Sequence, residues 1–146
     1  MTDYPDADLV VDAFAHNLAA ALGAHGGHLV RIATSHSDRG FEAVFGSSHT
    51  EFTAKLSQTE QGFWGLTEEK AAQLGGGGGE HLVLLTGEDE GYFLSSVALT
   101  RLVPAFSRTR DAAARINQNK IKRERRFSDL DELALLLSQK AVPRPA

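Results

Sequence analysis

The stretch GFEAVFGSSHTEFTAKLS, residues 40–57, constrains the fold more than any other part of the chain. Apolar residues alternate with polar ones on both sides of a Gly-Ser-Ser turn, so the apolar side chains of each segment share one face. This period of two predicts a β-hairpin that lies over a hydrophobic core. The predicted apolar face consists of Phe41, Ala43, Phe45, Phe52, Ala54 and Leu56.

The other face of this hairpin is polar. Its second strand carries Glu51, Thr53 and Lys55. If the turn lies near Ser47–Ser48, Glu42 on the first strand is expected opposite Ala54 and Lys55. A carboxylate and a lysine on adjacent strands can hold a divalent metal ion and orient a water for attack on a phosphodiester. The alternative is a cross-strand Glu–Lys pair on a solvent-facing surface.

The remaining segments predict helices and further strands around this hairpin. Helical periodicity and end signals predict helices over 6–27, 67–74 and 97–103, and after a capping box of Ser128 and Asp131. Short β-branched, aromatic or apolar runs predict strands over 28–34, 61–66, 80–87 and 92–95. We therefore predict a single α/β (α+β) domain, residues 1–142, with a mixed sheet, a central β-hairpin, helices on both faces and a frayed tail, 143–146.

Composition excludes several classes of protein. The chain of 146 residues contains no cysteine, which excludes disulfides, thiolate nucleophiles and cysteine-based zinc sites. The acidic start MTDYPDADLV lacks the basic and apolar regions of a signal peptide, and no apolar run approaches the roughly 18 residues of a membrane span. We expect a cytoplasmic protein with no membrane partner.

Two other patterns in the sequence bear on possible sites. The glycine run 75–79 is not a phosphate-binding loop, because no strand precedes it and no Lys-Ser/Thr pair follows it. The six histidines form no His-x-His or His-Glu-x-x-His pair. His25 and His28 could share a metal if the glycines between them fold back, or they could be ordinary loop residues.

Charge is distributed unevenly along the chain. Residues 1–100 carry four basic against fourteen acidic side chains, a net charge of −10, and residues 101–146 carry eleven against five, a net charge of +6. Much of this excess lies in the run NKIKRERRF, 119–127, which is expected to be an exposed edge strand or an extended arm. The candidate phosphate-binding residues are Arg115, Lys120, Lys122, Arg123, Arg125 and Arg126.

Three uses of this basic run remain open. Its arginine content favours bidentate contacts with nucleic-acid phosphates. It could instead dock onto the acidic segments Asp3–Asp12 or Glu88–Glu90, on the same chain or on a second copy. A solvated face without a partner is the third interpretation.

The segments from Phe41 to Ser96 resemble the core of the PD-(D/E)XK nuclease-like family, in its restriction-associated branches. The stretches that carry this resemblance are FEAVFGSSHTEFTAKLSQTEQGFWGLTEEKAAQL and HLVLLTGEDEGYFLSS. The family places a metal-binding acid on one hairpin strand and an acid-x-lysine triplet on the next. Glu42 matches the first acid and Lys55 matches the lysine, whereas Thr53 stands where the triplet has its acid. Glu51 lies two residues earlier on the same face, and Asp12 is the nearest match to a further acid on the first helix.

This resemblance implies a restriction-endonuclease-like fold with an altered site. The catalytic residues would be Glu42, Glu51 and Lys55, and the first two would bind Mg²⁺ or Mn²⁺ if the site is catalytic. Because Thr53 replaces the triplet acid, the sequence favours a DNA-binding protein that does not cleave, linked to restriction or DNA processing. The alternative is a non-enzymatic protein-interaction module, a homodimer or an accessory subunit, that uses the charge asymmetry.

Overall fold

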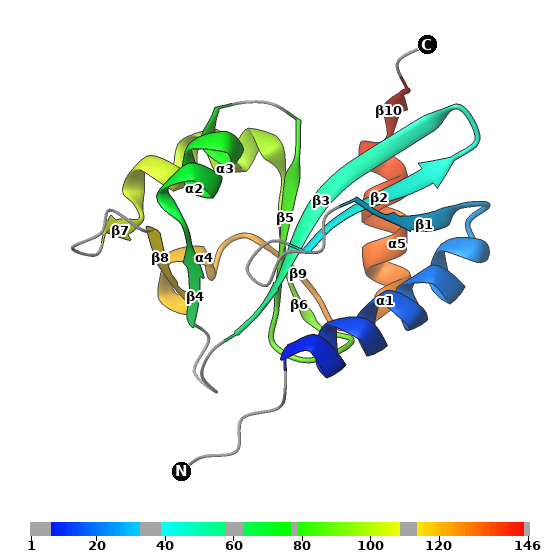
Figure 1. The fold of residues 1–146 in the computed structure, drawn as a ribbon, viewed down its shortest axis with the longest axis horizontal. Helices are drawn as coiled ribbons and strands as arrows, with labels where there is room; N and C mark the ends of the chain where they lie inside the picture. The colour runs from blue at the N-terminus through cyan, green and yellow to red at the C-terminus, as the bar shows by residue number, and fades with distance from the viewer. Residues whose placement is uncertain (1–6, 33–38, 58–62, 77–78, 109–113, 145–146) are drawn as a thin grey trace.

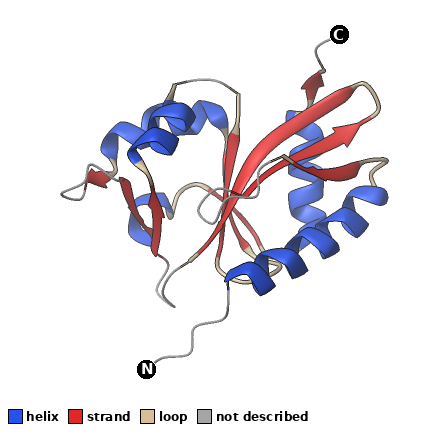
Figure 2. Cartoon of the chain, in the orientation of Figure 1, coloured by secondary structure: helices blue, strands red, loops and turns tan. Residues whose placement is uncertain are grey.

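The computed structural model describes residues 7–32, 39–57, 63–76, 79–108 and 114–144 of the chain. Figure 1 shows the path of the chain, and Figure 2 shows its helices and strands. The helices are α1 (Ala7–Gly23), α2 (Glu68–Gly75), α3 (Ser96–Leu102), α4 (Gln118–Ile121) and α5 (Leu130–Lys140), with a short 3-10 helix, η1 (Val103–Ala105).

The strands in these ranges form two sheets. The larger one has the spatial order β1-β2-β3-β5-β6-β9, with β10 also paired to β3, and the smaller one has the order β4-β8-β7. The larger sheet contains β1 (His28–Arg31), β2 (Arg39–Phe45), β3 (Ser48–Leu56), β5 (His81–Leu85), β6 (Gly91–Leu94), β9 (Arg125–Phe127) and β10 (Val142–Pro143). The smaller sheet contains β4 (Phe63–Leu66), β7 (Ser107–Arg108) and β8 (Ala114–Asn117).

The larger sheet is mixed, as predicted. Strands β3 and β5 run parallel, whereas β2 with β3 and β5 with β6 form antiparallel pairs. A parallel pair requires a crossover, and α2 lies in the segment that connects β3 to β5. The predicted mixed sheet, its central hairpin and the helices on both faces are therefore confirmed.

The register of the hairpin differs from the prediction. The turn consists of Gly46 and Ser47, and Gly46 adopts φ +63°, a conformation that glycine adopts without steric cost. Phe45 consequently pairs with Ser48, and Glu42 pairs with Glu51. The expectation that Glu42 lies opposite Ala54 and Lys55 was wrong. A two-residue turn at Ser47–Ser48 would already pair Glu42 with Thr53, and the observed turn begins one residue earlier, which moves the partner to Glu51.

One face of the larger sheet packs against α1 and α5, which lie side by side in Figure 1. The core on this face includes Phe14 and Leu18 of α1 and Leu133 of α5, all fully buried. The rings of Phe41 and Phe52 stack across the hairpin with their centroids 5.4 Å apart. The predicted apolar face of the hairpin is therefore its core face.

The opposite face packs against α2, α3 and the smaller sheet. Its core includes Trp64 of β4, Leu74 of α2 and Leu99 of α3. The indole Nε1 of Trp64 donates a hydrogen bond to the carbonyl oxygen of Leu85 at 3.1 Å, which ties the smaller sheet to the buried strand β5. Both faces of β5 are thus covered, as its continuous apolar run predicted.

The helix ends follow from local capping. Thr67 caps α2 by accepting a hydrogen bond from the backbone nitrogen of Lys70, as predicted. The last helix is capped by Asp129 rather than Ser128, and Glu132 rather than Asp131 reaches back to Ser128. The predicted capping box was therefore one residue too early.

The end of the chain is paired rather than frayed through Arg144. Val142 and Pro143 form β10 beside His49 and Ser48, and the backbone nitrogen of Arg144 donates to the carbonyl oxygen of Ser47 at 2.8 Å. Strand β10 occupies the part of β3 that β5 does not reach, because β5 first pairs with β3 at Phe52. The hairpin tip is thereby flanked on both sides.

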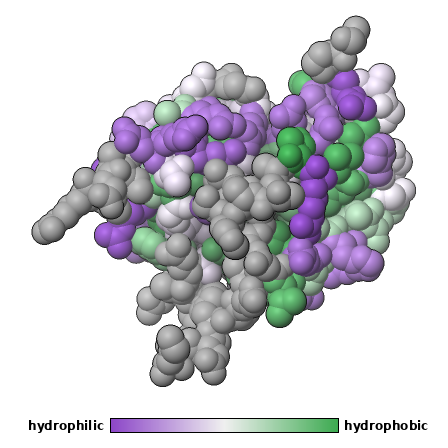
Figure 3. All heavy atoms as spheres, in the orientation of Figure 1, coloured by the Kyte–Doolittle hydropathy of each residue, from purple (hydrophilic) through white to green (hydrophobic). Residues whose placement is uncertain are grey.

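Exposed apolar side chains are scattered over the surface. On the face shown in Figure 3, hydrophilic side chains gather over α2 and α3, and the hydrophobic ones form small separate patches. Within the described ranges, no helix is long and apolar enough to cross a membrane.

Candidate functional site

Two of the three predicted catalytic residues meet on the polar face of the hairpin. Glu42 on β2 and Glu51 on β3 are direct cross-strand partners. In a hairpin with a two-residue turn this pair falls at a non-hydrogen-bonded position, where opposing side chains approach most closely. Lys55 shares their face but lies four residues along β3 from Glu51, about 13 Å at the usual rise of a strand. In the structure, Glu42 and Glu51 are therefore adjacent, whereas Lys55 lies at a distance from both.

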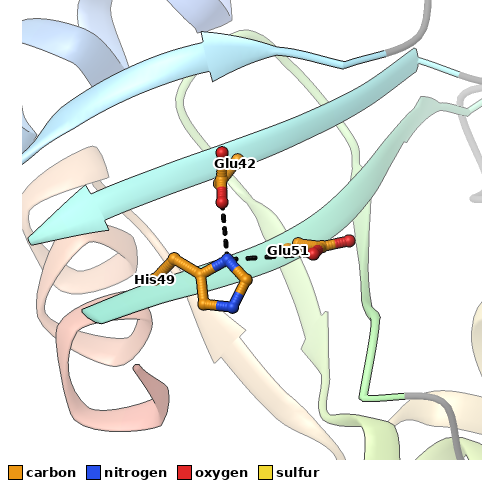
Figure 4. A group of neighbouring side chains, drawn as sticks. All are labelled: Glu42, His49 and Glu51. Carbon is orange, nitrogen blue, oxygen red and sulfur yellow. Dashed lines mark hydrogen bonds and ion pairs between the residues drawn. The ribbon is translucent and has the colours of Figure 1, made fainter. Parts of the chain in front are cut away.

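His49 completes a group of three side chains with these acids (Figure 4). Its Nδ1 lies 2.5 Å from Oε2 of Glu42 and 3.7 Å from Oε1 of Glu51. One ligand atom from each residue lies within 4.8 Å of the others. Imidazole and carboxylate are common ligands of divalent metal ions, so these three residues fit a metal.

The two acids of this group differ in their exposure to solvent and in their neighbours. The side chain of Glu42 is 15% exposed and that of His49 is 12% exposed, whereas that of Glu51 is 49% exposed. The guanidinium Nε of Arg144 lies 3.7 Å from Oε2 of Glu42. Glu42 is therefore held inside the group by two cationic or hydrogen-bonding neighbours, and Glu51 faces solvent.

Sequence reasoning missed His49, although a signal for it was present. His49 and Glu51 are two residues apart on a strand, which places both side chains on one face. Only the register of the turn was needed to set them against Glu42. A search for His-x-His and His-Glu-x-x-His spacings cannot find a group that is assembled across two strands.

The position of the missing triplet acid is occupied by a second network. Thr53 is fully buried, and its hydroxyl donates a short hydrogen bond to Oε2 of Glu80. The same oxygen accepts from Nζ of Lys70 at 2.9 Å, and Oε1 accepts from Nε2 of Gln73 at 2.7 Å. Both carboxylate oxygens of Glu80 thus accept hydrogen bonds from side chains of α2 and β3. The Glu80 side chain therefore links these two elements.

A pocket of about 270 Å³ borders the group of Glu42, His49 and Glu51, which we call the hairpin group. Its walls include His49, Glu51, His81, Ser96 and Lys140. Burial, together with a smaller effect of the positive charge of Lys140, lowers the pKa of His81 from 6.5 to about 4, and Glu80 opposes the shift. His81 is therefore neutral at neutral pH, and its Nδ1 accepts a hydrogen bond from the backbone nitrogen of Ser96 at 2.8 Å.

Asp12 and the histidine pair do not join the hairpin group. Asp12 of α1 forms an ion pair with Arg31, whose guanidinium lies over the ring of Phe41 on the α1 face of the sheet. Asp12 is therefore on the opposite face from Glu42. His25 and His28 are both exposed and belong to no metal-competent group among the described residues.

Two of the six candidate phosphate-binding residues have partners within the chain. The guanidinium of Arg115 on β8 lies 4.9 Å from the centroid of the Phe63 ring. The guanidinium of Arg125 on β9 lies 3.7 Å from Oε2 of Glu132. Both side chains remain exposed, so these contacts position them without removing them from solvent.

The other four have exposed side chains, and they lie on the segment from the end of α4 to the edge strand β9 of the larger sheet. The run 119–127, predicted to be an edge strand or an arm, forms the end of α4, a turn and the edge strand β9. Within the described part of the chain these four make no ion pair. We call the four residues the basic edge: Lys120, Lys122, Arg123 and Arg126.

No family model and no curated protein matches the sequence. Among solved structures, the fold is similar to that of Hjc, a Holliday junction resolvase from the archaeal hyperthermophile Archaeoglobus fulgidus, with a TM-score of 0.50. The two sequences are 17% identical, and the match covers 85% of this chain and 94% of that chain. At this identity the likeness concerns the fold alone. The chain therefore has a fold similar to that of this resolvase, and its place in a particular family stays a prediction.

Replacing Thr53 by glutamate would restore the acid of the triplet, and we expect it to destabilise the fold. The new carboxylate would be buried beside that of Glu80, and two like charges in one buried site are costly. We expect the free energy of unfolding to fall by at least about 2 kcal/mol in urea denaturation.

The isosteric variant Thr53→Val is the matched control, because it removes only a hydroxyl and should cost about 1 kcal/mol. The double variant Thr53→Glu/Glu80→Gln should regain part of the loss, because it removes one of the two charges. A Thr53→Glu variant as stable as the unmodified protein would show that Glu80 does not occupy this position.

Proposed function

We propose that this protein binds DNA through the basic edge and does not cleave it. The observation that carries the proposal is that the four side chains of the basic edge are exposed and have no acidic partner among the described residues. Exposed lysines and arginines without partners are suited to neutralise phosphates, and arginine does so in a bidentate geometry.

The neighbouring basic side chains support this use. Arg125 is 61% exposed beside Glu132, and a surface ion pair of this kind contributes little and can be exchanged for a phosphate. Arg115 is held over the ring of Phe63, which fixes its direction. The protein with the similar fold is a Holliday junction resolvase, so the fold itself is used by a protein that acts on branched DNA.

The alternative use of the basic edge is docking onto an acidic segment, on the same chain or on a second copy, and the segment Asp3–Asp12 begins outside the described residues. The turn Gly87–Glu90 presents Glu88 and Asp89 to solvent. Among the described residues, no ion pair joins this turn to the basic edge. The acidic turn is thus available for an intermolecular contact. DNA binding requires added DNA, whereas self-association is measured on the protein alone.

Duplex and four-way branched DNA should bind with an affinity that falls steeply as salt rises, because each neutralised phosphate releases counterions. We expect the double variant Arg123→Ala/Arg126→Ala to bind more weakly and to flatten the slope of log K against log salt by about two units. Fluorescence anisotropy over a salt series measures both quantities.

The matched control is Arg31→Ala/Arg144→Ala, which removes the same charge at half-exposed positions away from the basic edge. It should leave the slope unchanged. Absence of binding at low salt, or equal effects of the two double variants, would contradict the proposal. Salt-dependent self-association that disappears in Arg123→Ala/Arg126→Ala would favour the interaction module instead.

The absence of cleavage follows from the separation of the acids and the lysine. The metal-dependent hydrolysis that the nuclease resemblance implies needs at least two acids to hold the metal, and the lysine of the triplet to stabilise the developing charge or position the nucleophile. Glu42 and Glu51 supply the two acids, but Lys55 lies about 13 Å away along the strand. Thr53, a neutral side chain, stands beside Lys55 and is already bound to Glu80.

We therefore expect no cutting of supercoiled plasmid, single-stranded DNA or a four-way junction with Mg²⁺ or Mn²⁺ above the background of a mock preparation. Gel analysis of end-labelled substrates measures this directly. Metal-dependent cutting that is lost in both Glu42→Gln and Lys55→Ala would overturn this part of the proposal, and the DNA-binding part would stand.

A further inference from the structure

We propose that Glu42, His49 and Glu51 form a binding site for a divalent transition-metal ion, of the class of Zn²⁺, Co²⁺ or Mn²⁺, that opens onto the pocket beside α3. The site would use a histidine nitrogen and two carboxylate oxygens. It stands independently of DNA binding, since metal binding is measured on the protein alone.

The distances among the three side chains are close to those of a tetrahedral metal site. Metal–ligand bonds of about 2.1 Å place two ligand atoms about 3.4 Å apart. His49 Nδ1 and Glu51 Oε1 are 3.7 Å apart, which fits without rearrangement. His49 Nδ1 and Glu42 Oε2 are 2.5 Å apart, the distance of a hydrogen bond, and must separate by about 1 Å to admit an ion. A small rotation of either side chain provides this.

Charge also favours a cation at this position. Like charges directly opposite one another on neighbouring strands destabilise a sheet, and Glu42 and Glu51 are such a pair. Arg144 is 47% exposed and contacts only Glu42 within the group, at 3.7 Å. His49 lies against both acids. A divalent ion between the three side chains would neutralise both carboxylates and leave Arg144 free to turn to solvent.

The pocket beside the site also contains a buried polar side chain on the α1 and α5 face of the sheet, where His81 pairs with Phe52. His81 is 6% exposed and lines the same pocket as His49 and Glu51. Because Nδ1 of its neutral ring accepts a hydrogen bond from Ser96, the proton resides on Nε2. Among the described residues this donor has no partner.

The space and the donor types together indicate the class of ion. Three protein ligands leave at least one coordination position open, and a pocket of about 270 Å³ has room for several waters or a small anion. Imidazole nitrogen suits zinc and its neighbours, whereas Mg²⁺ prefers oxygen ligands in a strict octahedron. The histidine therefore selects a transition metal over magnesium.

Titration of the metal-free protein with Zn²⁺ and Co²⁺ tests the site, by calorimetry for Zn²⁺ and by visible absorption for Co²⁺. The chain has no cysteine, so any cobalt bands report nitrogen and oxygen ligands only. We expect one saturable site, an affinity at least tenfold weaker in His49→Gln and in Glu51→Gln, and binding of Mg²⁺ at least tenfold weaker than that of Zn²⁺.

The matched control is His25→Gln/His28→Gln, which removes two exposed histidines outside the group. It should retain the site with unchanged affinity. Glu51 is half-exposed, so Glu51→Gln keeps the test valid if His49→Gln unfolds, as circular dichroism would reveal. No saturable binding, or binding that is lost in the control and retained in Glu51→Gln, would overturn the proposal.

Discussion

The cross-strand pairing set by the two-residue turn at Gly46 and Ser47 is the constraint on which the candidate site depends. Because Gly46 accepts a positive φ, the strands reverse within two residues and Phe45 pairs with Ser48. This first pair fixes all the other pairs between β2 and β3. Glu42 therefore lies opposite Glu51 on one face, and the stacked rings of Phe41 and Phe52 lie on the other face, in the core beneath α1 and α5. A turn one residue longer would turn one strand over relative to its core.

The same pairing determines which side chains of β3 lie on each face of the sheet. Its core face holds Phe52 against α1 and α5, and its other face carries His49, Glu51 and Thr53 in a row. The end of the row near the turn meets Glu42 and the pocket, whereas Thr53 meets Glu80 and the helix α2. One face of β3 therefore carries two polar networks. The network near the turn could hold a metal ion, and the network at Thr53 links β3 to α2.

Local patterns predicted the elements well, and long-range geometry lay beyond them. The 3.6-residue period of α1, the cap at Thr67 and the apolar run of β5 each reflect forces between near neighbours in sequence. The site residues depend on other information: the length of a turn placed Glu42 opposite Glu51, and the crossover through α2 brought Glu80 to Thr53, 27 residues away. The basic run was correctly expected at an edge, but α4 occupies part of it, because Ile121 is drawn into the core beneath it.

The register of the hairpin is the central claim, and nuclear Overhauser contacts in solution test it most directly. At a non-hydrogen-bonded antiparallel pair the Cα atoms are about 4.5 Å apart, which brings the two Hα protons into strong contact. We expect a strong contact between the Hα protons of Glu42 and Glu51. A contact from the Hα proton of Glu42 to that of Ala54 or Lys55, with none to Glu51, would contradict it.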